Sequence, residues 1–325
     1  MSARLPPRDK ITIGFAHAAY QLGARFAARD TGIAHFEVRT AADLARRASE
    51  ADVLVVSGLW QNAYLEAAPR LRFVQSISAG VNQYDQALLR AKGVRLASAR
   101  GVNEIAVAEH AMALLLGLRR QLHTARDNQR RKHWRPMIAE IAAREDELAG
   151  KTLLIVGYGR IGQRLARLAR AFDMRVIGLR RNPEGSTGPA DAVRRVAELP
   201  RWLAEADAVV LTCPLTPETT GLIDAAALAA MKPSAVLINV ARGAVVDEAA
   251  LIAALQSGRI VAAGIDVTVE EPLPPASPLW GFENVLITPH SAGETRAYED
   301  NVLDILMANL ELMWRGEAGL RNQVV

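Results

Sequence analysis

Three side chains of reactive type each follow a short apolar run in the second half of the chain. They are Arg242, Glu271 and His290, and the runs preceding them are 235–240, 261–265 and 285–288. Short runs rich in Val and Ile, bounded by turn residues, predict strands that are buried in a parallel sheet. Because ligands bind beyond the carboxyl ends of such strands, we expect the three side chains to converge on one crevice.

This trio suits the reduction of a 2-oxo acid by hydride. The planar fork of an arginine matches a carboxylate, so Arg242 is the candidate for holding the substrate. An imidazole gains and loses a proton near neutral pH, so His290 is the candidate general acid and base at the carbonyl oxygen. Glu271 would orient that ring. Each residue also has a structural alternative. Arg242 would form a surface ion pair with Asp247, Glu271 would be merely an exposed acid, and His290 would be a core histidine.

A glycine-rich loop precedes the trio and predicts a dinucleotide site. Gly157, Gly159 and Gly162 follow an apolar run, open a helix predicted over 162–172, and precede a strand predicted over 175–179. In this context Gly157 permits a tight turn, Gly159 lets the backbone approach a pyrophosphate, and the helix N-terminus favours the phosphate charge. A turn that simply needs small residues is the alternative.

The end of the second strand predicts which dinucleotide binds. Arg180 and Arg181 stand where an acid would bond the adenosine ribose. A guanidinium pairs with a 2′-phosphate, whereas a carboxylate repels it. We therefore expect NADP(H) to be favoured, with NAD(H) as the alternative if these arginines are only solvated.

The surrounding pattern predicts an α/β protein with two parallel-sheet domains. Candidate strands in the first hundred residues are 11–15, 53–56, 73–77 and 94–97. A long helix is predicted over 105–122, followed by a polar arm and loop over 129–148. From Lys151, strand–helix units repeat as far as His290.

The last predicted helix, 295–315, places Leu303, Leu306, Leu310 and Met313 on one face, and we expect it to return to the first domain. We therefore expect two Rossmann-like or flavodoxin-like domains with a cleft between them. The substrate domain would be 1–100 with 294–325, and the dinucleotide domain 101–293.

Composition favours a cytoplasmic protein whose partners are neither membranes nor nucleic acids. The one cysteine, Cys213, allows no internal disulfide, and it is interpreted as a crevice-lining residue because no base adjoins it. No apolar stretch is long enough to span a bilayer, and the first ten residues lack the apolar core of a secretory signal. The formal charge is +4, and the basic run 130–133 lacks interleaved aromatic residues. The histidines show no metal-ligand spacing.

Six collinear motifs resemble the D-isomer-specific 2-hydroxyacid dehydrogenases over nearly the whole chain. They are Gly101–His110 (GVNEIAVAEH), Gly157–Gly162 (GYGRIG), Pro214–Thr219 (PLTPET), Asn239–Asp247 (NVARGAVVD), Asp266–Pro274 (DVTVEEPLP) and Thr288–Gly293 (TPHSAG). The resemblance implies that two subunits pair through the middle domain as a homodimer.

The same resemblance implies a role for each matching position. Arg242 would bind the substrate, Glu271 would support His290, and His290 would be the general acid and base. The substrate carboxylate would meet the backbone of Ser78, Ala79, Gly80 and Val81. Asp266 would bond the nicotinamide amide. The implied cofactor-binding set is Asn103, Gly157, Gly159, Arg160, Ile161, Gly162, Arg180, Arg181, Cys213, Pro214, Asp266 and His290.

Arg180 in place of the ribose-binding acid resembles glyoxylate/hydroxypyruvate reductases. The expected function is therefore hydride transfer between NADP(H) and a small 2-oxo or 2-hydroxy acid. A nucleotide-sensing, co-repressor-like binding protein is the alternative from another class, and a dehydrogenase of another small anion such as phosphite is a third. Trp60 and Trp134 are each either a substrate-pocket wall or a packing residue.

Overall fold

The computed structural model describes residues 5–185 and 188–325, which divide into two compact units. Unit 1 combines the chain up to Asn103 with Thr295–Val325, and unit 2 is Glu104–Glu294. The predicted domain boundaries, after residues 100 and 293, lie close to this division.

The described part of unit 1 contains one sheet of five parallel strands in the order β2-β1-β3-β4-β5, which is flavodoxin-like. The strands are β1 (Thr12–Ala16), β2 (Ala34–Val38), β3 (Val53–Val56), β4 (Phe73–Ser76) and β5 (Arg95–Ala97). Side chains alternate between the two faces of a strand. Val53 and Val55 therefore join one core, whereas Leu54 and Val56 join the other.

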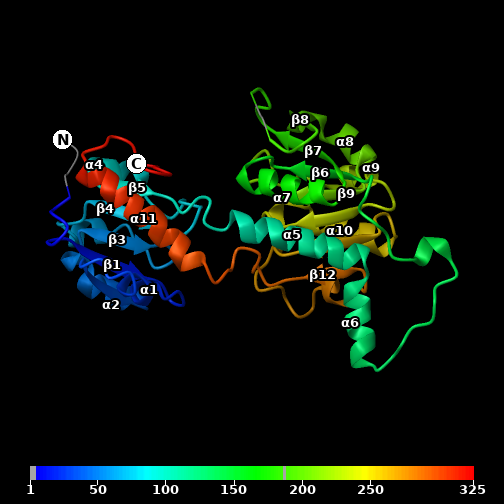
Figure 1. Ribbon diagram of the computed structural model, residues 1–325, viewed down its shortest axis with the longest axis horizontal. Helices are drawn as coiled ribbons and strands as arrows, with labels where there is room; N and C mark the ends of the chain where they lie inside the picture. Colours follow the sequence, from blue (N-terminus) through cyan, green and yellow to red (C-terminus); the bar gives the residue numbers. More distant parts are fainter. Residues whose placement is uncertain (1–4, 186–187) are drawn as a thin grey trace. The chain divides into compact units, whose positions relative to one another are not determined.

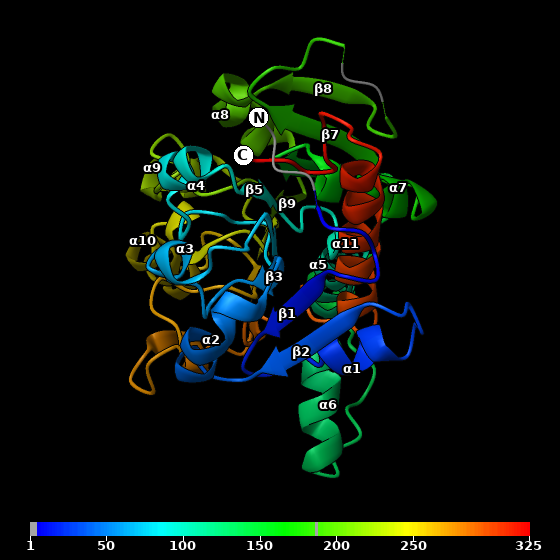
Figure 2. The same ribbon diagram turned by 90° about the vertical axis from the view of Figure 1, so that its left-hand side faces the viewer.

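Helices cover both faces of this sheet (Figure 2). On one face lie α1 (Leu22–Ala27) and α11 (Tyr298–Trp314), and on the other lie α2 (Ala41–Arg47), α3 (Tyr64–Ala67) and α4 (Gln86–Lys92). The apolar stripe predicted on the last helix is confirmed, because Leu303, Leu306, Leu310 and Met313 are all buried in the unit 1 core.

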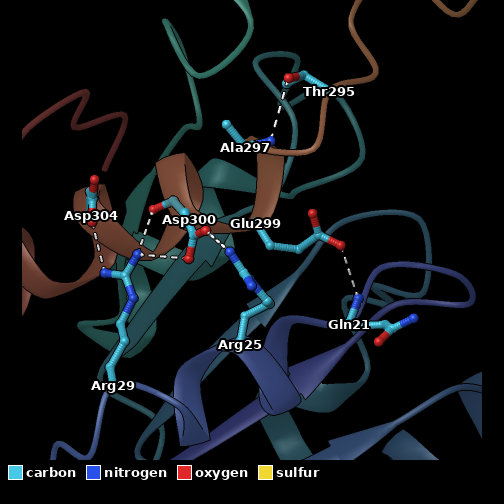
Figure 3. Close-up of polar contacts among 8 residues, drawn as sticks. All are labelled: Gln21, Arg25, Arg29, Thr295, Ala297, Glu299, Asp300 and Asp304. Carbon is cyan, nitrogen blue, oxygen red and sulfur yellow. Dashed lines mark hydrogen bonds and ion pairs between the residues drawn. The ribbon is translucent and has the colours of Figure 1, made fainter.

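A cluster of ion pairs fastens the first turns of α11 to α1 and the residues just after it (Figure 3). Arg25 pairs with Asp300. Arg29 bonds the side chains of Asp300 at 3.2 Å and Asp304 at 2.7 Å. These bonds join segments about 275 residues apart in the chain, so they hold the returning helix in unit 1.

The described residues of unit 2 form a sheet of seven parallel strands in the order β12-β11-β10-β9-β6-β7-β8. The strands are β6 (Thr152–Val156), β7 (Arg175–Arg180), β8 (Ala192–Arg195), β9 (Ala208–Leu211), β10 (Val236–Asn239), β11 (Ala262–Ile265) and β12 (Val285–Ile287). Strand order reverses between β6 and β9, and such a reversal is where open α/β sheets bind ligands.

Two helical layers enclose the unit 2 sheet (Figure 1). The helices α5 (Glu104–Arg119) and α7 (Arg160–Ala171) cover one face, and α8 (Leu199–Glu205), α9 (Ala225–Ala230) and α10 (Glu248–Gln256) cover the other. Hence α5 packs directly beneath β10, β11 and β12, the strands that the reactive trio follows.

The structure corrects the sequence-based elements in three places. The strands β2 and β8 were not predicted, because both lie at sheet edges and carry polar residues that give no buried apolar run. The predicted helix 105–122 ends at Arg119, where Gln121 adopts a left-handed backbone with φ 50°. A second helix, α6 (Leu122–Arg130), then leads into the arm.

Candidate active site

The glycine loop of unit 2 has the geometry of a dinucleotide cradle. Gly157 follows β6 with a φ of 104°, and a Cβ there would lie 2.4 Å from the backbone nitrogen of Cys213. A Cβ on Gly162 would lie 2.8 Å from the carbonyl oxygen of Gly157, so the helix packs closely on the strand. In contrast, a Cβ on Gly159 would meet nothing within 4 Å. The loop is therefore tight on its inner side and open at Gly159.

Three further cofactor candidates are Arg160, Ile161 and Asn103. Arg160 and Ile161 form the first turn of α7, which begins two residues earlier than predicted. The Arg160 side chain donates to Glu104 at 2.6 Å, so this guanidinium is paired within unit 2. Asn103 directly precedes α5 at the unit boundary.

Cys213 lies against the glycine loop and is 7% exposed. Burial raises the pKa of its thiol to about 11, which argues against a nucleophile because the thiolate is the reactive form. Pro214 follows it and is exposed. The position of Cys213 fits its predicted role as a crevice-lining residue.

Arginines gather at the ends of β7 and β8. Arg180 is the last residue of β7 and pairs in register with Arg195 of β8. Arg181 is exposed and stands 3.9 Å from Glu218, while Arg195 bonds Glu184 at 2.7 Å. Sequence reasoning missed Arg195 because β8 was not recognised as a strand, although its position beside Arg180 makes this edge more basic.

His290 and Glu271 are in direct contact. The Nδ1 of His290 lies 2.7 Å from Oε2 of Glu271, and the other oxygen, Oε1, accepts the backbone N–H of Thr268 at 3.1 Å. The side chains are 46% and 38% exposed. The alternatives of a core histidine and a merely exposed acid are therefore wrong.

Arg242 is exposed and stands directly ahead of a short 3-10 turn, Gly243–Val245. Its Nη1 donates to the carbonyl oxygen of Ala241 at 2.6 Å. The buried amide of Asn239 braces this turn, because its nitrogen donates to the Arg242 carbonyl oxygen at 3.0 Å and its oxygen accepts the Ala241 N–H. Asp247 caps α10 by accepting the Ala250 N–H, so the chain uses that acid for helix capping.

Gly243 lets the Arg242 turn approach the loop that carries Glu271. A Cβ at Gly243 would lie 2.0 Å from both the carbonyl carbon and the oxygen of Thr268. Thr268 in turn donates to Glu271. The three reactive residues thus follow the adjacent strands β10, β11 and β12, and close backbone packing joins the first two loops.

Asp266 is enclosed by hydrogen bonds. Its carboxylate is 2% exposed and accepts the hydroxyl of Thr288 at 2.5 Å and the backbone N–H groups of Ser291 and Ala292 at 2.9 and 3.0 Å. Its carbonyl oxygen accepts the N–H of His290 at 2.8 Å. Asp266 therefore holds the turn that carries His290, a function that sequence reasoning did not foresee.

The predicted carboxylate loop, Ser78–Val81, follows β4 in unit 1. The Ser78 hydroxyl lies 2.6 Å from that of Ser57 and donates to the Gly80 carbonyl oxygen at 2.8 Å. Ala79 and Gly80 are exposed. The loop is therefore braced from within unit 1 while its tip stays accessible.

The two tryptophans differ sharply in burial. Trp60 is 6% exposed, packs against Tyr64 and Tyr84, and donates from its indole nitrogen to Asn62 at 2.8 Å. It is therefore a packing residue. Trp134 is 96% exposed on the segment that follows α6, where Met137 is equally exposed.

Two further features bear on partners. Within residues 5–185 and 188–325, no three metal-ligating side chains gather into a cluster. Over the same residues, no helix combines the length and the apolar character needed to cross a bilayer.

Comparison with known proteins matches this geometry. Residues 112–292 match the family described as D-isomer specific 2-hydroxyacid dehydrogenase, NAD binding domain. The chain belongs to this family. The match covers most of unit 2, and a relative aligned over 80% of the chain extends the similarity into unit 1.

Individual relatives lie within the same family. The chain is 38% identical to glyoxylate/hydroxypyruvate reductase B of Yersinia enterocolitica over 80% of each chain. It is 38% identical to D-3-phosphoglycerate dehydrogenase of Mycobacterium leprae over 82% of this chain, but spans only half of that relative. A solved family member from Aeromonas salmonicida superposes with a TM-score of 0.83 and 30% identity, covering 97% of this chain and 99% of that one.

Proposed function

We propose that this 2-hydroxyacid dehydrogenase is an NADP(H)-preferring reductase of small 2-oxo acids, with glyoxylate and hydroxypyruvate as the leading substrates. The observation that carries the proposal is the 2.7 Å contact between His290 and Glu271. It lies at the carboxyl edge of the sheet in the unit that matches an NAD binding domain. The reductase named among the relatives supports the substrate class.

The glycine loop fits a dinucleotide. Open space at Gly159 would admit the pyrophosphate, and the N-terminus of α7 supplies N–H groups at Arg160 and Ile161. When bound, a reduced nicotinamide dinucleotide supplies the hydride. Asp266 would bond the nicotinamide amide, while its carboxylate also holds the His290 turn through the N–H groups of Ser291 and Ala292.

The proton comes from His290. Its Nδ1 faces a carboxylate and carries one proton, so in the imidazolium form the second proton is on Nε2, the nitrogen that donates to the substrate. As negative charge develops on the carbonyl oxygen of the substrate, Nε2 transfers its proton to that oxygen. Until this transfer, the Glu271 carboxylate stabilises the positively charged ring. The guanidinium of Arg242 would pair with the substrate carboxylate, assisted by the backbone of Ser78–Val81.

The test measures the absorbance of NADPH or NADH as it is oxidised in the presence of each of a panel of 2-oxo acids. Phosphite is tested in the reverse direction, as the reductant of the oxidised cofactors. We expect glyoxylate or hydroxypyruvate to be reduced, and His290→Ala to lower turnover about a hundredfold or more while cofactor binding persists. If none of the acids is a substrate but the protein still binds the dinucleotide, the binding-protein alternative would be favoured. Unchanged turnover in His290→Ala would remove that residue from its role.

The NADP(H) preference rests on the arginines at the ends of β7 and β8. Arg180, Arg181 and Arg195 place positive charge where a 2′-phosphate would lie. Arg181 pairs with the exposed Glu218, and Arg195 pairs with the exposed Glu184. Arg180→Asp combined with Arg181→Ala should shift preference towards NADH in kcat/KM. An unaltered ratio of kcat/KM for the two cofactors would refute the phosphate-pairing argument.

We also propose that the enzyme is a cytoplasmic homodimer that pairs through unit 2. The arm after α6 exposes Trp134, Met137 and Ile141 by 96%, 96% and 75%, and exposed large apolar groups of this kind mark association surfaces. Sedimentation equilibrium should give twice the chain mass, and Trp134→Lys with Met137→Lys should give the monomer. A monomeric wild-type protein would contradict the proposal.

A further inference from the structure

A chain of polar side chains runs from α5 to the turn of His290. His110 lies on α5, Thr288 directly follows β12, and Asp266 directly follows β11. The Nε2 of His110 lies 2.9 Å from the Thr288 hydroxyl, which lies 2.5 Å from Oδ1 of Asp266. The sequence separation between His110 and Thr288 is 178 residues, so this series of hydrogen bonds exists only in the folded unit.

The proton inventory gives each bond a direction. The threonine hydroxyl has one hydrogen, and its short bond to a carboxylate assigns that hydrogen to Asp266. The hydroxyl oxygen must then accept from His110, so Nε2 of His110 carries a hydrogen. Asp266 is a buried carboxylate, 2% exposed, and each donor that it loses leaves charge unsatisfied.

The turn held by this carboxylate is strained at His290. His290 has a φ of 54°, a left-handed conformation that is unfavourable for a residue with a Cβ. Hydrogen bonds to Asp266 hold the backbone at His290 and just after it. The N–H groups of Ser291 and Ala292 donate to its carboxylate, and the N–H of His290 donates to its carbonyl oxygen. With the backbone of His290 in this conformation, its imidazole ring contacts Glu271.

We propose that Thr288 and His110 are positioning residues, which hold the Asp266 carboxylate in place so that the strained turn keeps His290 against Glu271. The assignment rests on the proposed function of His290 as general acid. Neither residue touches the substrate in this scheme. Each acts through Asp266 on the backbone of residues 290–292.

Matched variants separate the hydrogen bond from the volume of the side chain. Thr288→Val keeps the shape but removes the hydroxyl, whereas Thr288→Ser keeps the hydroxyl. His110→Leu removes the donor, whereas His110→Gln keeps an N–H donor of similar reach. Thermal melting of each variant checks that it is folded before the other measurements.

The first readout is hydrogen exchange of the Ser291 and Ala292 amides, followed by mass spectrometry with fragmentation in the absence of substrate. We expect exchange to accelerate about tenfold in Thr288→Val and His110→Leu, because loss of one hydrogen bond has an effect of this order. Thr288→Ser and His110→Gln should exchange at the wild-type rate. Unchanged exchange in the valine and leucine variants overturns the proposal.

The second readout is turnover. In Thr288→Val and His110→Leu, kcat should fall about tenfold or more while the cofactor KM stays constant, and the serine and glutamine variants should restore it. Faster exchange with an unchanged kcat would show that the turn does not serve His290, which also overturns the proposal. If the wild-type protein reduces no 2-oxo acid, the proposed function fails, while the exchange result still decides whether Thr288 and His110 hold the turn.

Discussion

The close approach of Gly243 to the Glu271 loop makes Gly243→Ala a sharp test of the site geometry. The added Cβ would stand 2.0 Å from the carbonyl group of Thr268, and ordinary contacts of this kind begin at 3.4 Å. One backbone must therefore move by about 1.4 Å. Neither partner is the end of a flexible side chain, so the strain cannot be relieved by a rotamer change.

That displacement has two consequences. Overpacking of this kind lowers the free energy of unfolding by about 1–3 kcal/mol. Because Thr268 donates to Glu271, the movement also withdraws Glu271 from His290. A shift of about 1 Å in a catalytic group can lower the rate about a hundredfold, so kcat should fall by that order.

Urea unfolding and steady-state reduction of the best 2-oxo acid measure the two effects. Gly281→Ala is the matched control, because a Cβ there meets nothing within 4 Å and the residue lies in the same unit. It should change stability by less than about 0.5 kcal/mol and leave kcat unchanged. Wild-type kcat in Gly243→Ala would refute the argument that close packing of these two loops places Glu271.

Three further predictions follow from other parts of the fold. Because burial raises the pKa of Cys213 to about 11, iodoacetamide at pH 8 should label the urea-unfolded chain much faster than the native one, and equal rates would contradict this. The bond from Arg25 lowers the pKa of the Asp300 carboxyl, so Asp300→Asn should lower unfolding free energy by ~1 kcal/mol at pH 7. That difference should shrink in 1 M salt. It should also shrink progressively as pH falls below about 4, because the carboxylate of the folded protein, whose pKa is lowered, becomes protonated only at still lower pH; a constant difference in urea unfolding would refute the ion-pair account. Asn309 is fully buried and exchanges hydrogen bonds with the Arg321 backbone at 2.7 and 3.2 Å, so Asn309→Leu should cost about 1–3 kcal/mol in the same assay, and a neutral result would contradict it.

The strand pattern and the motif residues could be predicted because their signals are local. Buried parallel strands need continuous apolar runs, so β3, β6 and β10 are visible in the sequence as Val- and Ile-rich segments. A glycine turn between a strand and a helix is equally local. The stripe on α11 follows from helical period alone.

Two of the edge strands, β2 and β8, were not predictable in this way. Edge strands bury only part of their surface, so β2 and β8 carry polar residues and lack an apolar run. The break at Gln121 has no glycine or proline to mark it. Consequently the sequence predicted a single helix where the chain forms α5 and α6.

The sequence by itself determined which side chains stand at the strand ends: Arg242, Glu271 and His290 follow three successive runs, and the parallel sheet brings such positions to one edge. Only the tertiary structure decided how they are held. The contact of Glu271 with His290, the close packing of Gly243 on Thr268, and the bonds that enclose Asp266 all join residues from different loops. Residue pattern reports which face or end of an element a side chain occupies, whereas a hydrogen bond between loops depends on distances that only the packed fold sets.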